Sequence, residues 1–230
     1  QTCALPILFA LMARQRQMAS SIVGAIESWK NSGVLEELLQ EDLGILIPEE
    51  FSEPDAAADL SDLAAHLDIS ELEEQDTKYN ALRDFLQKSL AKNPHEKFVL
   101  FAFFKGTLNY LNRRLEAEGF RTTLLHGDID SDRTELIDKF ASNNGPNILL
   151  SSEVGSEGID LQFCRFLINY DLPWNPMRVE QRIGRLDRLG QKSDRISIIN
   201  LQVINTIEDR IIMRLYERIN VFRESIGDLE

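Results

Sequence analysis

The chain has 230 residues, 43% of them hydrophobic, which is ordinary for one globular domain with an appendage. It contains no apolar run near the roughly 18 residues that cross a bilayer, so the sequence predicts no association with membranes. Two cysteines, Cys3 and Cys164, are too few for a disulfide framework and favour a reducing, cytoplasmic location.

The net charge of −13 by itself disfavours nucleic-acid binding, but the acidity is unevenly distributed. Residues 1–96 contain 7 Lys and Arg against 18 Asp and Glu. Residues 97–230 contain 18 against 20, and this part is therefore nearly neutral. The segment 41–76 alone carries 13 acids and no base. Nucleic-acid binding therefore remains open for the part that follows residue 96.

The N-terminal third is predicted to be helical and partly irregular. Residues 1–7 (QTCALPI) resemble the translated end of a sequencing adapter, which predicts a fragment whose natural sequence extends upstream. A genuine apolar start is the alternative. Residues 8–75 are expected to form a helical and acidic segment, with helices at 9–30, 33–41 and 56–67 and a loop around Pro48 and Pro54.

A helix expected at 71–90 places apolar side chains on one face and ends at Asn93-Pro94. This apolar stripe consists of Tyr79, Leu82, Phe85, Leu86 and Leu90. From residue 97 onward, strands alternate with helices. Strands are expected at 97–104, 122–125, 147–151, 166–169 and 195–203, and helices at 108–118, 132–140, 178–189 and 206–222. This alternation predicts an α/β fold with a parallel sheet of about six strands, covered on both faces. Cys164 is expected in the core.

The segment 180–191 (EQRIGRLDRLGQ) carries the sharpest chemical pattern. On a helix, Gln181, Arg185 and Arg188 stand at i, i+4 and i+7 and share one face. Guanidinium forks match phosphate oxygens and remain charged at any working pH, so this face suits a polyphosphate. The structural alternative is a surface helix whose arginines pair with Glu180 and Asp187.

Two further patterns precede it. Residues 150–160 (LSSEVGSEGID) follow a buried strand with two glycines, where small residues let backbone N–H groups approach phosphates; a plain tight turn is the alternative. Residues 169–176 (NYDLPWNP) form a rigid turn around Trp174, whose structural alternative is a packing anchor.

Together these patterns resemble the C-terminal RecA-like lobe of Swi/Snf-type superfamily-two helicase ATPases, over residues 76–230. The segment 180–191 agrees with the family's Q-x-x-G-R-x-x-R-x-G-Q motif, and D-x-x-W-N-P is typical of this subfamily. The bacterial RNA-polymerase-associated recycling ATPases are the most similar group. The resemblance implies that Arg185 and Arg188 act catalytically on a nucleotide held by the other lobe, beside the nucleotide-binding residues Gln181, Gly158 and Asp160. It implies nucleic-acid contacts at Lys105, Thr107, His126, Gly127, Ser151, Ser152 and Trp174.

The resemblance implies ATP and Mg²⁺ as cofactors and DNA, most simply double-stranded, as substrate. The implied protein partners are the N-terminal RecA-like lobe of the same protein and RNA polymerase or another DNA-bound protein, in the nucleoid. No G-x-x-x-x-G-K-[ST] loop and no D-E-x-H-type motif occur in the sequence, so this segment alone is expected not to hydrolyse ATP. His126 has no partner at metal-ligand spacing, and no metal site is predicted.

Two other functions remain open. One is a non-catalytic module, a lone lobe that binds polymerase or nucleic acid. The other is a helicase that separates strands, which the W-N-P turn disfavours. A nuclease lacks support, because no carboxylates cluster at metal-binding spacing.

Overall fold

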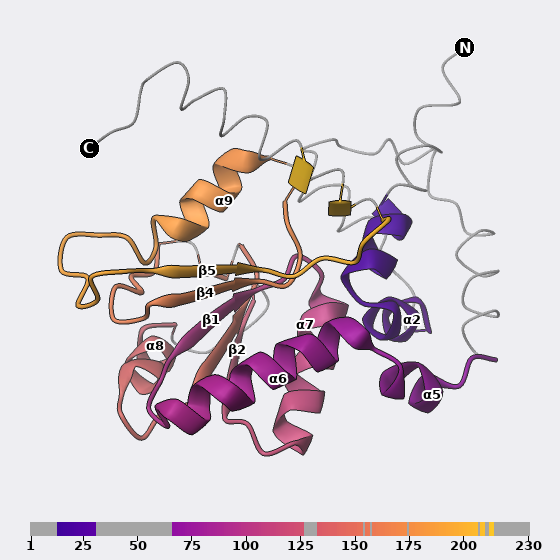
Figure 1. The fold of residues 1–230 in the computed structure, drawn as a ribbon, viewed down its shortest axis with the longest axis horizontal. Coiled ribbons are helices and arrows are strands. Elements are labelled where there is room, and N and C mark those ends of the chain that lie inside the picture. Colours follow the sequence, from indigo (N-terminus) through magenta and orange to yellow (C-terminus); the bar gives the residue numbers. More distant parts are fainter. Residues whose placement is uncertain are drawn as a thin grey trace, which may run out of the picture.

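A five-stranded parallel sheet forms the centre of the molecule, in the order β2-β3-β1-β4-β5 (Figure 1). The computed structural model describes residues 13–30, 66–126, 133–153, 155–156, 158–173, 175–206, 208–209 and 212–213. Its strands are β1 (Phe98–Phe101), β2 (Thr122–Leu125), β3 (Ile148–Ser151), β4 (Phe166–Asn169) and β5 (Ser197–Asn200). The described part therefore confirms the α/β fold with a parallel sheet, at five strands where about six were expected.

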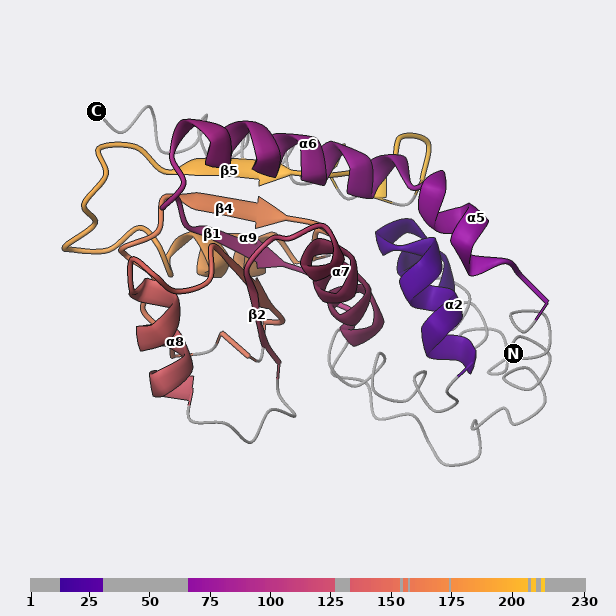
Figure 2. The ribbon, with the colours of Figure 1, turned by 90° about the horizontal axis from the view of Figure 1, so that it is seen from below.

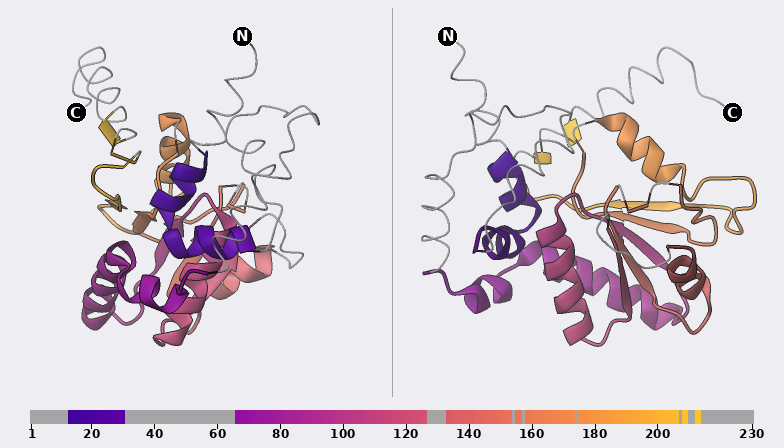
Figure 3. Two further views of the ribbon diagram at one scale, coloured as in Figure 1. Left: turned by 90° about the vertical axis from the view of Figure 1, so that its right-hand side faces the viewer. Right: turned by 180° about the vertical axis from the view of Figure 1, so that it is seen from behind.

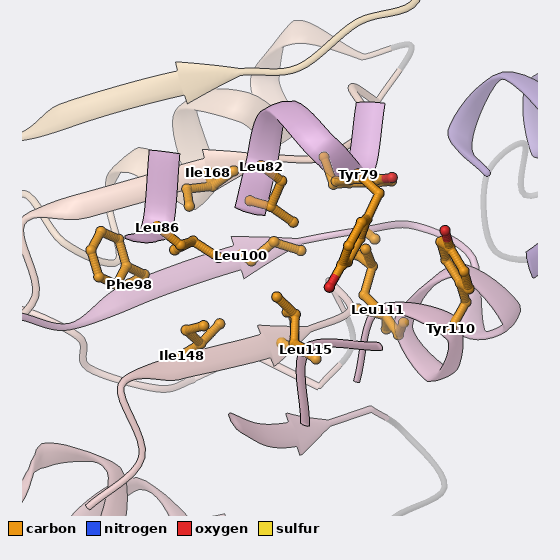
Figure 4. Packing of buried hydrophobic residues seen from close by; sticks show 14 of the residues in the cluster. Tyr79, Leu82, Leu86, Phe98, Leu100, Tyr110, Leu111, Leu115, Ile148 and Ile168 are labelled. Carbon is orange, nitrogen blue, oxygen red and sulfur yellow. The ribbon is translucent and has the colours of Figure 1, made fainter. Parts of the chain in front are cut away.

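Side chains alternate across this sheet, because successive residues of a strand point to opposite faces. On one face, Phe98 and Leu100 of β1 pack against α6 (Thr77–Lys92) and α7 (Lys105–Ala117). Figure 2 shows α6 running alongside the strands. Figure 4 shows this packing, with Tyr79, Leu82 and Leu86 of α6 lying over the strands. The predicted apolar stripe is confirmed, since these three side chains are buried and Phe85 and Leu90 pack beside them.

The opposite face carries Val99 and Phe101 of β1. Phe140 of α8 (Arg133–Ala141) and Leu186, which follows α9 (Pro176–Ile183), cover it. Cys164 lies in the same cluster and is buried, as predicted. The sheet is thus enclosed between two layers, as the uniformly apolar central strands require.

Residues 13–30 pack directly against the lobe. They form a helical run at 13–20 and α2 (Ile22–Lys30), which lies beside α7 (Figure 3). The two helices touch at their glycines, and a Cβ built on Gly106 would lie 2.6 Å from the carbonyl oxygen of Gly24. Val23 belongs to the same core cluster as β1. This part of the expected appendage is therefore built into the core of the lobe.

Several predicted helices have other bounds in the structure. The helix expected at 9–30 is interrupted at Ser21, and the one expected at 108–118 begins at Lys105. The helix expected at 71–90 is divided into α5 (Ile69–Glu74) and α6, because Asp68 and Asp76 each cap a helix N-terminus with their side chains. The helix expected at 178–189 is wrong at both ends, because α9 begins at Pro176 and ends at Ile183. The helices expected at 33–41 and 56–67 and most of the one at 206–222 lie outside the described residues.

None of the helices in the described ranges is long and apolar enough to cross a membrane.

Candidate functional site

The carboxyl ends of β1, β3 and β4 meet at one edge of the sheet. The parallel register aligns Phe101 of β1 with Ser151 of β3 and with Asn169 of β4. The segments that follow these strands, residues 102–104, 152–160 and 170–175, therefore begin side by side. Ligands of parallel sheets bind at such an edge. The two sequence patterns at 150–160 and 169–176 begin at this edge of the sheet.

A buried arginine, Arg182 of α9, lies under this edge and was not among the predicted site residues. It is only 2% exposed. One terminal nitrogen donates to Asn169 Oδ1 at 2.7 Å and to the carbonyl oxygen of Asp171 at 3.0 Å. The other donates to Glu153 Oε1 at 2.8 Å. The guanidinium also lies 5.1 Å from the ring centre of Phe101, so it reaches the ends of all three strands.

Glu153 balances two arginines of α9. Its Oε1 accepts from Arg182 and its Oε2 from Arg178, each at 2.8 Å. Arg178 and Arg182 stand four residues apart and so project from one helix face. Burial lowers the pKa of Arg182, while the carboxylates of Glu153 and Asp171 raise it. The buried guanidinium depends on these acids, because a buried charge without a partner is costly.

Asp171 joins the strand ends to the N-terminal helical residues. Its carboxylate accepts from the backbone N–H of Phe103 at 2.9 Å and from the Ser20 hydroxyl at 2.7 Å. Arg16 donates to the carbonyl oxygen of Leu172 at 3.0 Å and lies 4.7 Å from the ring centre of Phe103. Burial is the main cause that lowers the pKa of Arg16 to about 10. A segment outside the three sequence motifs thus supplies buried polar contacts to this edge.

The arginine turn, residues 184–190, follows α9. Because the helix ends at Ile183, the predicted i, i+4, i+7 alignment of Gln181, Arg185 and Arg188 on one continuous helix face is wrong. Tighter turns replace it: the backbone N–H of Arg185 bonds the carbonyl oxygen of Arg182 at 3.1 Å, and that of Leu186 bonds Ile183 at 2.9 Å. Gln181 is exposed on the last turn of α9.

Arg185 and Arg188 have different surroundings in this turn. Arg188 pairs with Asp160 at 3.1 Å, and both side chains are about half exposed. The Arg185 guanidinium is half-buried and makes no hydrogen bond or ion pair within the described residues. Its carbonyl oxygen accepts from the N–H of Leu161 at 3.0 Å. The segments 150–160 and 180–191 are therefore in contact through the main chain of Arg185.

The other predicted nucleotide-binding residue, Gly158, is exposed and has φ +78°. This left-handed conformation strains other residues and suits glycine. Gln191 closes the turn, since its amide donates to the carbonyl oxygens of Cys164 at 3.0 Å and Leu186 at 2.9 Å. The fixed glutamine of the motif thus has a structural role here.

The residues expected to contact the nucleic acid differ in how far they are buried. Lys105, the first residue of α7, and His126, directly after β2, are half-buried. Ser152 is mostly buried at the strand end, and its hydroxyl accepts from the N–H of Gly155 at 3.1 Å. Gly127 and Trp174 lie outside the described residues, as does Glu157, expected beside an arginine or in water.

Thr107 and Ser151 differ from the expectation, because both side chains are fully buried. The Thr107 hydroxyl lies 3.0 Å from that of Ser20, and the Ser151 hydroxyl donates to the carbonyl oxygen of Ser152 at 2.9 Å. In this arrangement both hydroxyls have hydrogen-bond partners within the chain. The helical residues 13–20, whose position the sequence did not predict, are the reason for the burial of Thr107.

The donor set at this edge matches an anion. Two arginines and an amide suit phosphate oxygens, whereas Mg²⁺ requires oxygen ligands. Within the described ranges, no three His, Cys, Asp or Glu side chains are grouped so that they could hold a metal ion. The spacing of Arg178 and Arg182 is the sequence signal that could have pointed to Arg182 and Glu153. Two arginines on one helix face repel each other, and an acid between them relieves that repulsion.

Comparison with known proteins identifies the lobe. Residues 77–190 match the family described as the helicase conserved C-terminal domain. The chain is 39% identical over 141 residues to the uncharacterized ATP-dependent helicase YqhH of Bacillus subtilis, covering 61% of this chain and 25% of that protein. It is 37% identical over 145 residues to the RNA polymerase-associated protein RapA of Vibrio vulnificus, covering 62% of this chain and 15% of RapA. The match thus spans a quarter or less of these relatives.

Solved structures support the fold. The C-terminal part of the Fun30 ATPase domain aligns with a TM-score of 0.57 at 21% identity, over 82% of this chain and 64% of that one. The Hef helicase domain of Pyrococcus furiosus aligns with a TM-score of 0.53 at 19% identity, over 85% and 38%. The sequence matches and this fold agree with the predicted lobe. The chain therefore contains a region, residues 77–190, that matches the helicase conserved C-terminal domain and is similar in sequence to RapA and YqhH.

Proposed function

We propose that this chain is the second motor lobe of an ATP-dependent DNA translocase, and that it completes an ATP site built mainly by a first lobe. The half-buried Arg185 guanidinium carries the proposal, because it makes no hydrogen bond or ion pair within the described residues. Its main chain is held on both sides, by Arg182 and Leu161. A fixed backbone with a free guanidinium is the arrangement expected of a residue that meets a phosphate supplied from outside the lobe.

Arg188 would act beside it after exchanging partners. Its pair with Asp160 is half exposed, and such pairs contribute only about 0–1 kcal/mol. A nucleotide phosphate can therefore displace Asp160 at little cost. On closure of the two lobes, both arginines would stabilise the charge that develops on the transferring phosphoryl group. Gln181 and Gly158 would line the same site. The first lobe would hold Mg²⁺ and most of the ATP.

The nucleic acid would lie along the strand-end edge. Lys105, His126 and Ser152 lie at the ends of three neighbouring strands, β1, β2 and β3. Gly127 follows His126 in sequence, and Trp174 belongs to the segment that follows β4. Contacts to backbone phosphates position a protein without selecting a sequence, which suits a motor that moves along DNA. The relative RapA is named as RNA polymerase-associated, and we extend that association to this protein as its candidate client.

The test is ATP turnover by the full-length protein that contains both lobes. Arg185→Ala should lower kcat about a thousandfold or more, because arginine fingers contribute about 10³–10⁵. Arg165→Ala serves as the matched control. Arg165 directly precedes β4, is half exposed and pairs with Glu96, outside the arginine turn. Wild-type turnover in Arg185→Ala would reject the proposal. DNA or polymerase binding without any ATP turnover in the wild type would identify a binding module instead.

A further inference from the structure

Arg182 connects the arginine turn to the strand ends through both its side chain and its main chain. Its side chain bonds Glu153 after β3 and Asn169 and Asp171 of the β4 end. Its carbonyl oxygen accepts from the N–H groups of Gly184 and Arg185. One residue therefore touches the edge assigned to nucleic acid and the turn assigned to the nucleotide.

The segment between β3 and β4 is attached at two points, one on α9 and one on the arginine turn that follows it. Near its start, Glu153 bonds Arg182, and near its end the N–H of Leu161 bonds the carbonyl oxygen of Arg185. Glu153 also follows directly on Ser152, whose hydroxyl and carbonyl groups bond Gly155 and Ser156. A displacement at residues 151–153 would thus reach Arg185 through two short paths.

The connection through Arg182 depends on the charge of the Glu153 carboxylate. Arg182 is fully enclosed, and its Nε has no hydrogen-bond partner within the described residues. Glu153 is its only ion-pair partner there, and the same carboxylate also holds Arg178. Neutralising Glu153 would leave two arginines four residues apart on α9 without their shared counter-charge. Like charges at this spacing repel, and a buried arginine needs its partner.

We propose that Arg182 and Glu153 form a positioning joint that transmits nucleic-acid binding at the strand ends to the nucleotide-facing Arg185. Neither residue touches ATP in this arrangement; they set where the arginine turn lies when the lobe binds DNA. This inference rests on the proposed function, since it concerns the coupling of its two binding surfaces. It assigns a role to two residues outside the predicted set of nucleotide and nucleic-acid contacts.

The experiment measures ATP turnover by the full-length protein with and without double-stranded DNA. Glu153→Gln keeps the shape of the side chain and removes its charge. It should reduce DNA-stimulated kcat about tenfold, while the KM for ATP and the half-saturating DNA concentration stay within about twofold. Arg182→Lys should give a similar loss, because one ammonium nitrogen cannot occupy the positions of both terminal guanidinium nitrogens, one of which bonds Asn169 and Asp171 and the other Glu153. The double variant should be no worse than either single variant, since both changes break one joint.

Glu96→Gln is the matched control. It removes a carboxylate from a 2.7 Å arginine pair before β1, at the opposite end of the sheet, and should leave the DNA stimulation unchanged. Unaltered stimulation in Glu153→Gln, or losses that multiply in the double variant, would overturn the joint. If Arg182→Lys fails to fold, Glu153→Gln decides alone. A wild type without DNA-stimulated turnover would instead refute the proposed function, which separates the two failures.

Discussion

At the scale of single residues, Cys164 shows how burial lowers the reactivity of a thiol. Its thiol donates to the carbonyl oxygen of Lys97 at 3.0 Å within the core, and burial raises its pKa to about 12. The thiolate is the nucleophile, so at pH 8 the folded protein holds about a thousandfold less of it than an ordinary cysteine with a pKa near 9.0. We expect Cys164 to resist iodoacetamide until the chain unfolds.

The measurement uses a Cys3→Ser background, so that Cys164 is the only thiol. The alkylation rate is followed by mass spectrometry in buffer and in denaturing urea. A native rate close to that of a free peptide cysteine would show that the core opens readily around residues 161–167. The prediction that this cysteine is structural, which the sequence suggested from its apolar neighbours, would then need revision.

At the scale of elements, the contact between α2 and α7 depends on two glycines. In Gly106→Ala the added methyl group would lie 2.6 Å from the carbonyl oxygen of Gly24, an atom of a helix backbone that cannot turn away. Alanine favours a helix over glycine by about 1 kcal/mol, whereas overpacking costs about 1–3 kcal/mol. We expect the clash to prevail and the free energy of unfolding of the chain to fall by about 1–2 kcal/mol in urea titration.

Asn109→Ala on the same helix is the control, because Asn109 is exposed. Its free energy of unfolding should stay within about 0.5 kcal/mol of the wild type. If Gly106→Ala were as stable as this control, α2 would not be packed on α7 in solution. The burial of Thr107 behind Ser20 would then have no support.

At the scale of the whole molecule, a buried ion pair connects distant parts of the chain. Lys78 of α6 donates to both carboxylate oxygens of Glu208 at 2.8 and 2.9 Å and to the carbonyl oxygen of Ala19 at 3.1 Å. Both side chains are at most 5% exposed. Lys78→Met leaves Glu208 buried without its counter-charge, so the free energy of unfolding should fall by about 3–5 kcal/mol at pH 7.

The pH dependence of this loss has a definite sign. Burial raises the pKa of Glu208, and Lys78 opposes that rise. Without Lys78, the folded state favours the protonated acid more strongly. A carboxyl group whose pKa is higher in the folded than in the unfolded chain stabilises the folded state at low pH. This stabilisation is complete below the pKa of the unfolded glutamate and is lost as the pH rises through the pKa of the folded one. Urea titrations at pH 4.5 and 7 should show a smaller deficit at the lower pH. A deficit that is equal at both pH values would contradict this origin.

Local signals in the sequence determined the elements. The apolar run at 98–104 predicted the buried strand β1, and the stripe of Tyr79, Leu82 and Leu86 predicted the buried face of α6. The motif spacing predicted the family, which the match at residues 77–190 supports. These features depend on neighbours along the chain, and so they are visible in one dimension.

Contacts between distant residues required the tertiary structure. The end of α9 at Ile183 depends on turns that pack Leu186 into the core, and so the alignment of Arg185 and Arg188 on one helix could not be anticipated. The hydrogen-bond partners of Arg182 come from the ends of two strands, β3 and β4, up to 29 residues away. The sequence by itself therefore determined the fold class and the resemblance to a helicase C-terminal domain. Only the tertiary structure decided which buried acids and arginines meet at the strand ends, because that pairing depends on the register of the parallel sheet.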